Sequence, residues 1–354
     1  MRIALLGVGL IGGSVGLAAR ERLGAEIVGH DPSRRALEEA LERGAVDRTT
    51  ATAADALAGS SACFCCAPVG ELPGLVAEAL AAAPSDCVVT DVGSTKRAIA
   101  ACARDERFVG GHPVAGAETA GVRHARADLF QDAAWYLTPS ERSSGVLYER
   151  LHRLVTGLGA RPVALDAETH DRLLATVSHL PHVLANVLVA QAADTATEEG
   201  EVLPAAGPSF RDATRVAGAN TGIWTDIYLS NADAIAAEVD DTARRLGEVA
   251  AALRAGEADA IRGWNDAARA ARTRLVDPDL AAGPVSELTV SVPNQPGIVA
   301  QVALALGRAG VNIADLALAP AADMRSGSIT LWVSGERARE RACELIVDLG
   351  YPVS

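Results

Sequence analysis

The stretch Gly7-Val8-Gly9-Leu10-Ile11-Gly12 decides the fold of the first half of the chain. It follows an apolar run at residues 2–6, which is typical of a β-strand, and it opens a helical pattern that extends through Leu17. In this strand–turn–helix setting, the spacing G-x-G-x-x-G is a strong dinucleotide-binding fingerprint. The first glycine permits a tight turn, the second lets the backbone approach a pyrophosphate, and the third lets helix and strand pack closely. The predicted cofactor contacts at this helix N-terminus are Gly7, Gly9, Leu10, Ile11 and Gly12.

Asp31 supplies the second part of the predicted nucleotide site. It ends the second predicted strand, roughly twenty residues beyond the glycines, where such sites place an acidic side chain. A carboxylate there binds both ribose hydroxyls and repels a 2′-phosphate, which favours NAD over NADP. Arg34 and Arg35 lie close by and keep NADP open as an alternative. A glycine turn that binds no ligand is the remaining alternative.

Residues 1–165 alternate between short apolar runs and helical patterns, as at 33–43 and 71–82. This alternation predicts an α/β domain with a mostly parallel, doubly wound sheet of Rossmann type. The predicted strands are residues 2–6, 26–30, 62–67, 87–91, 107–110, 134–138 and 162–165.

The strand signal disappears over residues 166–276, which predicts an all-α domain. Asp166 can cap a helix that runs toward Leu180, where Pro181 must kink or end it. Further on, two apolar stripes at helical spacing are separated at Gly256 and predict an antiparallel helical hairpin, suited to a bundle or a dimer interface. The stripes are Ile235, Val239, Leu246 and Leu253, then Ile261, Trp264, Ala268, Ala271 and Leu275.

Residues 277–284 read as a linker because they are rich in Asp, Pro, Ala and Gly. Residues 285–354 then follow a strand–helix–strand–strand–helix pattern, with room for a short last strand after residue 350. This order predicts a ferredoxin-like βαββα(β) domain.

Composition limits the classes of partner. The chain has 354 residues, 49% of them hydrophobic, and a net charge of −13 without a block of basic residues. These values exclude a disordered chain and disfavour nucleic acid and anionic membranes as partners. We also expect no membrane span after the first strand. The six cysteines lack the paired spacing of a metal site, so we predict no metal and a reducing, cytoplasmic location.

Three segments carry residues suited to chemistry. Gly110-Gly111-His112-Pro113-Val114-Ala115-Gly116 places a histidine in a predicted rigid turn after a strand, and histidine exchanges protons near neutral pH. Asp91-Val92-Gly93-Ser94-Thr95-Lys96 follows a strand whose end should face the ligand crevice, with Lys96 directed at solvent, substrate or the Ser94 loop. The third segment, Ser178-His179-Leu180-Pro181-His182, lies at the predicted kink, where His179 reads as structural.

Together with Phe210-Arg211-Asp212-Ala213-Thr214-Arg215, these motifs resemble the prephenate and arogenate dehydrogenases over roughly residues 1–275. The resemblance implies NAD-dependent oxidation and decarboxylation of prephenate to 4-hydroxyphenylpyruvate, the precursor of tyrosine. It implies that His112 takes the proton of the substrate 4-hydroxyl and that Ser94 orients that hydroxyl. It also implies substrate-binding roles for Arg215, His182 and Glu118. A dianionic substrate needs such a local arginine in an acidic protein.

Residues 285–354 resemble an ACT domain, a ligand-sensing module of amino-acid biosynthetic enzymes. The resemblance rests on Asn294-Gln295-Pro296-Gly297 and on Gly310-Val311-Asn312-Ile313. It implies an allosteric site at Asn294, Gly297 and Asn312, with tyrosine as a feedback inhibitor. A trimmed or purely structural unit is the alternative, because few residues remain for the last strand.

Other functions remain open at this point. Arogenate (cyclohexadienyl) dehydrogenase activity differs only in substrate, and His182 in place of an amide residue favours prephenate. A β-hydroxyacid dehydrogenase is disfavoured because residues 166–276 contain no lysine to act as its acid or base. A non-catalytic regulator that senses NAD and an amino acid is disfavoured by the joint presence of Ser94, His112 and Arg215. The helical region predicts a homodimer, and the sequence leaves open which subunit Arg215 serves.

Overall fold

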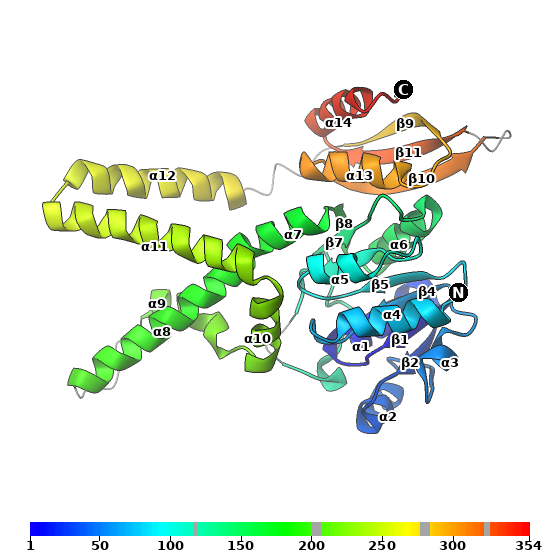
Figure 1. Cartoon of the computed structure of the whole chain (residues 1–354), viewed down its shortest axis with the longest axis horizontal. Coiled ribbons are helices and arrows are strands. Elements are labelled where there is room, and N and C mark those ends of the chain that lie inside the picture. The colour runs from blue at the N-terminus through cyan, green and yellow to red at the C-terminus, as the bar shows by residue number, and fades with distance from the viewer. Residues whose placement is uncertain (117–118, 200–206, 277–283, 322–325) are drawn as a thin grey trace. The chain divides into compact units, whose positions relative to one another are not determined.

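The computed structural model describes residues 1–116, 119–199, 207–276, 284–321 and 326–354 (Figure 1). Contacts divide the chain into two units. The first comprises Met1–Asp171, Asn220–Ser230 and Gly283–Ser354, and the second comprises Arg172–Ala219 and Asn231–Ala282. Of the predicted linker 277–284, all but Pro284 lies outside the described residues. The predicted domain boundaries therefore stay predictions.

A five-stranded parallel sheet forms the start of the first unit, in the order β3-β2-β1-β4-β5. This order and the helices between the strands confirm the predicted Rossmann-type domain. The strands are β1 (Arg2–Leu6), β2 (Glu26–His30), β3 (Arg48–Thr49), β4 (Ala62–Cys65) and β5 (Val88–Asp91). The helices are α1 (Leu10–Leu23), α2 (Arg34–Glu42), α3 (Ala53–Leu57), α4 (Leu72–Ala82) and α5 (Arg97–Cys102).

A second sheet of three strands follows, in the order β6-β7-β8. Strand β6 (Gly110–Pro113) is antiparallel to β7 (Ala134–Thr138), and β7 is parallel to β8 (Arg161–Ala164). The short helical turn η1 (Val122–His124) precedes β7, and helix α6 (Gly145–Gly157) lies between β7 and β8. Buried Trp135 on β7 contacts the ring of Phe64 on β4 edge-on, with a centroid distance of 6.1 Å. The two sheets therefore share one apolar core.

The structure corrects the expectation that His112 lies in a turn after a strand at residues 107–110. The strand is Gly110–Pro113 itself, and the preceding segment makes only a single bridge, Phe108 to Val89. The two glycines serve close packing, because a Cβ at Gly110 would clash with Thr138 Oγ1 and one at Gly111 would lie 2.6 Å from the Asp91 carbonyl oxygen. His112 is therefore held by a hydrogen-bonded strand.

The predicted helix after Asp166 is present and its interruption is explained. The Asp166 carboxylate accepts from the Thr169 backbone N–H at 2.8 Å and caps α7 (Ala167–Leu174). A π-helical turn, η2 (Ala175–His179), then leads into α8 (Leu180–Glu199), of which Pro181 is the second residue. Proline lacks an N–H and clashes with the carbonyl four residues earlier, and the wider π-turn accommodates both effects.

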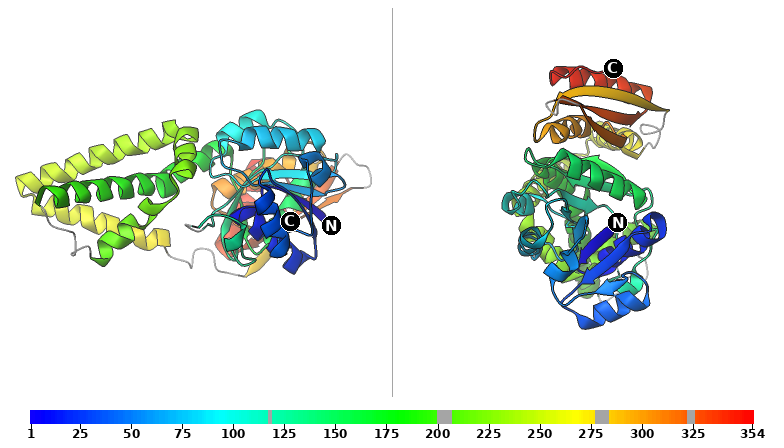
Figure 2. Two further views of the ribbon diagram at one scale, coloured as in Figure 1. Left: turned by 90° about the horizontal axis from the view of Figure 1, so that it is seen from below. Right: turned by 90° about the vertical axis from the view of Figure 1, so that its right-hand side faces the viewer.

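The remaining helices are α9 (Pro208–Thr214), η3 (Arg215–Gly218), α10 (Thr221–Ser230), α11 (Ala232–Ala255) and α12 (Ala258–Val276). Helices α11 and α12 lie side by side and antiparallel, as predicted (Figure 1, Figure 2). Gly256 ends α11 with φ of +67°, which favours glycine. The helical stretch Ala167–Thr195 is long and apolar enough to cross a membrane by length and composition alone, which the sequence analysis did not expect.

The C-terminal part of the first unit contains β9 (Val285–Pro293), α13 (Ile298–Arg308), β10 (Ile313–Pro320), β11 (Ser326–Ser334) and α14 (Glu336–Asp348). Its antiparallel sheet has the order β10-β11-β9, and Thr289 and Ser354 exchange backbone hydrogen bonds of 2.8 and 2.9 Å at the edge of β9. The element order matches the predicted pattern. The finer assignment to the ferredoxin-like ACT domains stays a prediction.

Candidate active site

The glycine turn forms a cradle that fits a dinucleotide. Gly7 has φ of +99°, and a Cβ there would clash with the backbone carbonyl of Cys66. A Cβ at Gly12 would clash with the carbonyl of Gly7, whereas one at Gly9 would meet no described atom within 4 Å. Two glycines therefore permit the turn, and the third leaves open space at the N-terminus of α1. Among the described residues, no side chain caps that helix end, so its N–H groups are suited to bind a phosphate. Leu10 and Ile11 are half-buried there.

Asp31 is fixed beside this cradle. Its carboxylate accepts from the backbone N–H of Val8 at 2.9 Å and of Ser33 at 2.7 Å. Arg34 and Arg35 pair with glutamates of their own helix at 3.0 Å each. The acidic side chain, rather than a cation, is thus attached to the glycine turn, which suits the ribose of NAD.

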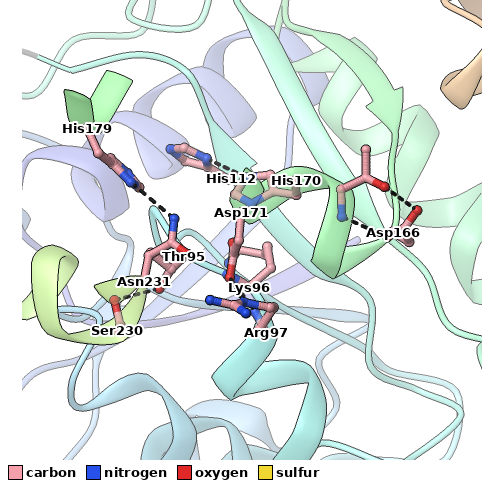
Figure 3. Close-up of polar contacts among 12 residues, drawn as sticks. Thr95, Lys96, Arg97, His112, Asp166, His170, Asp171, His179, Ser230 and Asn231 are labelled. Atoms are coloured by element: carbon pink, nitrogen blue, oxygen red, sulfur yellow. Dashed lines mark hydrogen bonds and ion pairs between the residues drawn. The ribbon is translucent and has the colours of Figure 1, made fainter. Parts of the chain in front are cut away.

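His112 belongs to a chain of buried polar side chains (Figure 3). Its Nδ1 lies 2.9 Å from Nε2 of His170, and Nδ1 of His170 lies 2.8 Å from Oδ1 of Asp171. His170 and Asp171 come from the first turns of α7 and are fully buried, while His112 is 8% exposed. The strand β6 and the helix α7 thus bring together residues that lie 58 positions apart in the sequence.

Backbone donors keep Asp171 ionised. Burial opposes its charge, but the hydrogen bond from His170 and those from the backbone N–H groups of Arg97 and Lys96 hold the pKa of Asp171 below its usual value. Burial lowers the pKa of His170, against the raising effect of Asp171. At neutral pH the pair therefore consists of a carboxylate and a neutral imidazole.

The carboxylate of Asp91 forms hydrogen bonds with both segments that carry Ser94 and His112. Its carboxylate accepts from the backbone N–H of Gly93 at 2.8 Å and of Gly111 at 3.1 Å, and it forms a buried ion pair with Lys96. Burial lowers the pKa of Lys96, and Asp91 opposes that effect. Lys96 is 1% exposed, which excludes the solvent-facing alternative of the three that the sequence left open. Ser94 is half-buried on the loop between β5 and α5.

The second unit brings together the other two described site candidates. His182 lies on α8, is 5% exposed, and contacts Asn186 Nδ2 through Nδ1 at 3.1 Å. Burial lowers the pKa of His182, and a hydrogen bond with the backbone of Val216 opposes the shift. Val216 follows Arg215, which starts η3 and is exposed. Glu118 lies outside the described residues.

Sequence reasoning missed His170, Asp171 and the role of Asp91. The available signal was the run of three polar residues Thr169-His170-Asp171 shortly after the capping Asp166, within the first turns of a helix. His179, read as structural, is buried and contacts Asn231 Nδ2 at 3.3 Å.

The fold and the nucleotide cradle define a dinucleotide-dependent dehydrogenase with a helical second domain. Residues 15–164 match the family model of the prephenate dehydrogenase nucleotide-binding domain, and residues 166–265 match that of the prephenate dehydrogenase dimerization domain. The chain belongs to the prephenate dehydrogenase family, and it is an NAD-dependent oxidoreductase.

Individual relatives agree with this assignment. The chain is 29% identical over 352 residues to a prephenate dehydrogenase of Bacillus subtilis. This alignment covers 97% of the present chain and 95% of the relative. It is 31% identical over 310 residues to that of Lactococcus lactis, covering 85% of each. In fold, it is similar to the crystal structure of Aquifex aeolicus prephenate dehydrogenase with hydroxyphenyl propionate and NAD+. The TM-score is 0.72 at 24% identity, over 78% of this chain and 98% of that one.

Proposed function

We propose that the chain oxidises prephenate with NAD and that His112 is the general base of the reaction. The 4-hydroxyl of the substrate loses its proton to His112 as C4 loses a hydride and becomes a carbonyl. NAD, when bound, supplies the hydride acceptor. Loss of the ring carboxylate as CO2 then makes the ring aromatic, and the phenolate oxygen regains a proton. Atoms and charge balance with 4-hydroxyphenylpyruvate, CO2 and NADH as products.

The observation that carries this proposal is the position of His112. It is a nearly buried histidine on β6, a strand that contacts the carboxyl end of β5, where the chain leads into the Ser94 loop. Ligands of doubly wound sheets bind outside the carboxyl ends of the strands. Ser94 is assigned to orient the 4-hydroxyl. Arg215 is assigned to a substrate carboxylate, and His182 and Glu118 are assigned to substrate binding, as the family resemblance implies.

The direct test is NADH formation at 340 nm with prephenate and NAD, using wild type and His112→Asn. We expect wild-type turnover and a loss of roughly 10²- to 10⁴-fold in the variant. Binding of NAD by both proteins, followed by fluorescence, serves as the control for folding. An active wild type with an equally active His112→Asn variant would move the base to another residue.

Arogenate is the second candidate substrate, because it differs from prephenate only in carrying an amine in place of the side-chain keto group. His182, where an amide residue would suit the amine, favours prephenate. Steady-state kinetics with both substrates decide the matter. A higher kcat/KM with arogenate would overturn the preference for prephenate.

Feedback inhibition by tyrosine through residues 285–354 is the regulatory part of the proposal. It is supported by a cavity of about 330 Å³ at the start of α13, because the N-terminus of a helix suits a carboxylate. Its lining includes Ser144, Asn294, Ile298, Leu318, Ser328 and Ile329, whose apolar members suit an aromatic ring. Gly297 is the residue before α13, and neither Gly297 nor Asn312 is among the described lining residues.

The test of this regulation is tyrosine inhibition of the full-length enzyme, comparing wild type with Ser328→Trp, which fills the cavity. We expect the variant to keep its kcat and to lose at least tenfold in sensitivity to tyrosine. Unchanged inhibition that competes with prephenate would instead place tyrosine in the active site.

Homodimerisation is proposed from the apolar faces of the helical unit. Leu246, Leu253 and Trp264 are each more than half exposed on α11 and α12, and Val187 is 54% exposed on α8. Such a set of exposed apolar side chains is typical of an interface. We assign the exposed apolar side chains within Ala167–Thr195 to this interface rather than to a membrane, and the enzyme to the cytoplasm. Light scattering on wild type and Trp264→Glu tests the dimer, and a monomeric wild type would refute it.

A further inference from the structure

We propose that His170 and Asp171 position His112, by fixing which of its ring nitrogens is the base and by holding the positive charge that forms on it. This inference rests on the proposed role of His112 as the general base. The three side chains form an unbroken series of contacts within one unit, with 2.9 Å from His112 to His170 and 2.8 Å from His170 to Asp171.

The direction of the hydrogen bonds follows from the carboxylate. An ionised Asp171 only accepts hydrogen bonds, so Nδ1 of His170 must carry a proton. Neutral His170 then has a lone pair on Nε2, which accepts from Nδ1 of His112. His112 is thereby held as the tautomer whose Nε2 lacks a proton. That nitrogen is the one we assign to the substrate hydroxyl.

The same series stabilises the product of proton transfer. When Nε2 of His112 takes the substrate proton, the imidazolium donates through Nδ1 to His170, which in turn donates to the Asp171 carboxylate. The carboxylate is fixed by backbone donors from Lys96 and Arg97, at 2.7 and 2.9 Å, so its charge stays in place without rearrangement. Because all three groups are buried, their mutual interactions are only weakly screened by water.

Other groups around the pair set its electrostatic background. The Lys96 ammonium lowers the pKa of His170, and the carboxylates of Asp171 and Asp91 raise it. On the remaining side, the ring of Tyr136 on β7 lies 5.4 Å from that of His170, edge-on. Burial raises the pKa of Tyr136, so this phenol is neutral over the working range of pH.

The test compares His170→Leu, which removes the acceptor, with His170→Gln, whose amide oxygen can accept from His112 but cannot take up a proton. We expect His170→Leu to lower kcat by roughly 10- to 10³-fold with little change in KM, and the acid limb of the kcat/KM profile to shift in pH. His170→Gln should recover part of kcat. An unchanged Kd for NAD shows that each variant is folded.

Two further measurements separate this inference from the proposed function. The double variant His112→Asn/His170→Leu should be no slower than His112→Asn, because His170 acts only through His112. If His112→Asn loses activity while His170→Leu keeps the wild-type kcat and pH profile, the positioning role is refuted and the base stands. Equal losses in His170→Leu and His170→Gln would also overturn it, since an acceptor alone would then restore nothing. A fast His112→Asn variant would refute the base itself.

Discussion

The buried ion pair between Asp91 and Lys96 allows a quantitative prediction about the active-site loops. Both side chains are at most 1% exposed, and removing one partner of such a pair leaves an uncompensated buried charge, which costs about 3–5 kcal/mol. For Lys96→Met, we expect a loss of stability at the lower end of this range, because the Asp91 carboxylate still accepts hydrogen bonds from the N–H groups of Gly93 and Gly111. For Asp91→Asn, we expect a loss of stability at the upper end of the range. The new amide has only one oxygen to accept from three donors, the N–H groups of Gly93 and Gly111 and the Lys96 ammonium.

These costs correspond to a fall in melting temperature of roughly 10 °C for each single variant, measured by far-UV circular dichroism at pH 7. The double variant Asp91→Asn/Lys96→Met should lose about 3 kcal/mol less than the sum of the two single losses, because no unpaired charge remains. Arg34→Met is the matched control. Its partner Glu38 lies on the surface, and such pairs contribute about 0.5 kcal/mol. If the melting temperature of either single variant lies within about 2 °C of that of this control, the reasoning about the buried pair is wrong.

Three further predictions concern the cofactor site and the response to pH. Gly7→Ala should lower the melting temperature because of the positive φ and the clash with the Cys66 carbonyl, whereas Gly9→Ala should leave it unchanged and weaken NAD binding in a fluorescence titration. Asp31→Ser should raise the KM for NAD by roughly tenfold or more and reduce the preference for NAD over NADP. Unchanged kinetics with both cofactors would refute the assignment of Asp31 to the ribose. Burial lowers the pKa of His152 to about 4, below its unfolded value, so acid favours the unfolded state. The free energy of unfolding is therefore unaffected by His152 above about pH 6.5 and falls by roughly 3 kcal/mol as the pH is lowered toward about 4. In denaturant unfolding, His152→Phe should remove this part of the pH dependence.

Local patterns predicted most of the fold. The glycine fingerprint, the alternating apolar runs and the capping Asp166 each depend on residues close in sequence, and the structure confirms the elements that they indicate. The exception, the strand at Gly110–Pro113, arises because the two glycines are needed for close packing against Asp91 and Thr138, a contact between distant segments.

The chemical site was predictable only in part for the same reason. His112 and Ser94 stand out through their motifs, but the partnership of His112 with His170 depends on the packing of β6 against α7. The sequence left Lys96 open between solvent, the substrate and the Ser94 loop, because a sequence does not show burial. Its partner Asp91 was visible only as the end of a strand. Buried polar pairs are set by tertiary contacts, so they carry no short-range signal.

The contacts of α13 determine which parts of the molecule unfold together. A Cβ at Gly307 would clash with the carbonyl of Ala164 on β8, Arg308 forms an ion pair of 2.9 Å with Asp166, and Val299 contacts Gly145 closely enough to exclude a methyl group there. The C-terminal residues therefore belong to the same cooperative unfolding unit as the second sheet and the start of α7. Amide hydrogen exchange should show α13 and β8 exchanging together, and a chain truncated before residue 285 should lose stabilising contacts of β8 and the start of α7 along with its last domain.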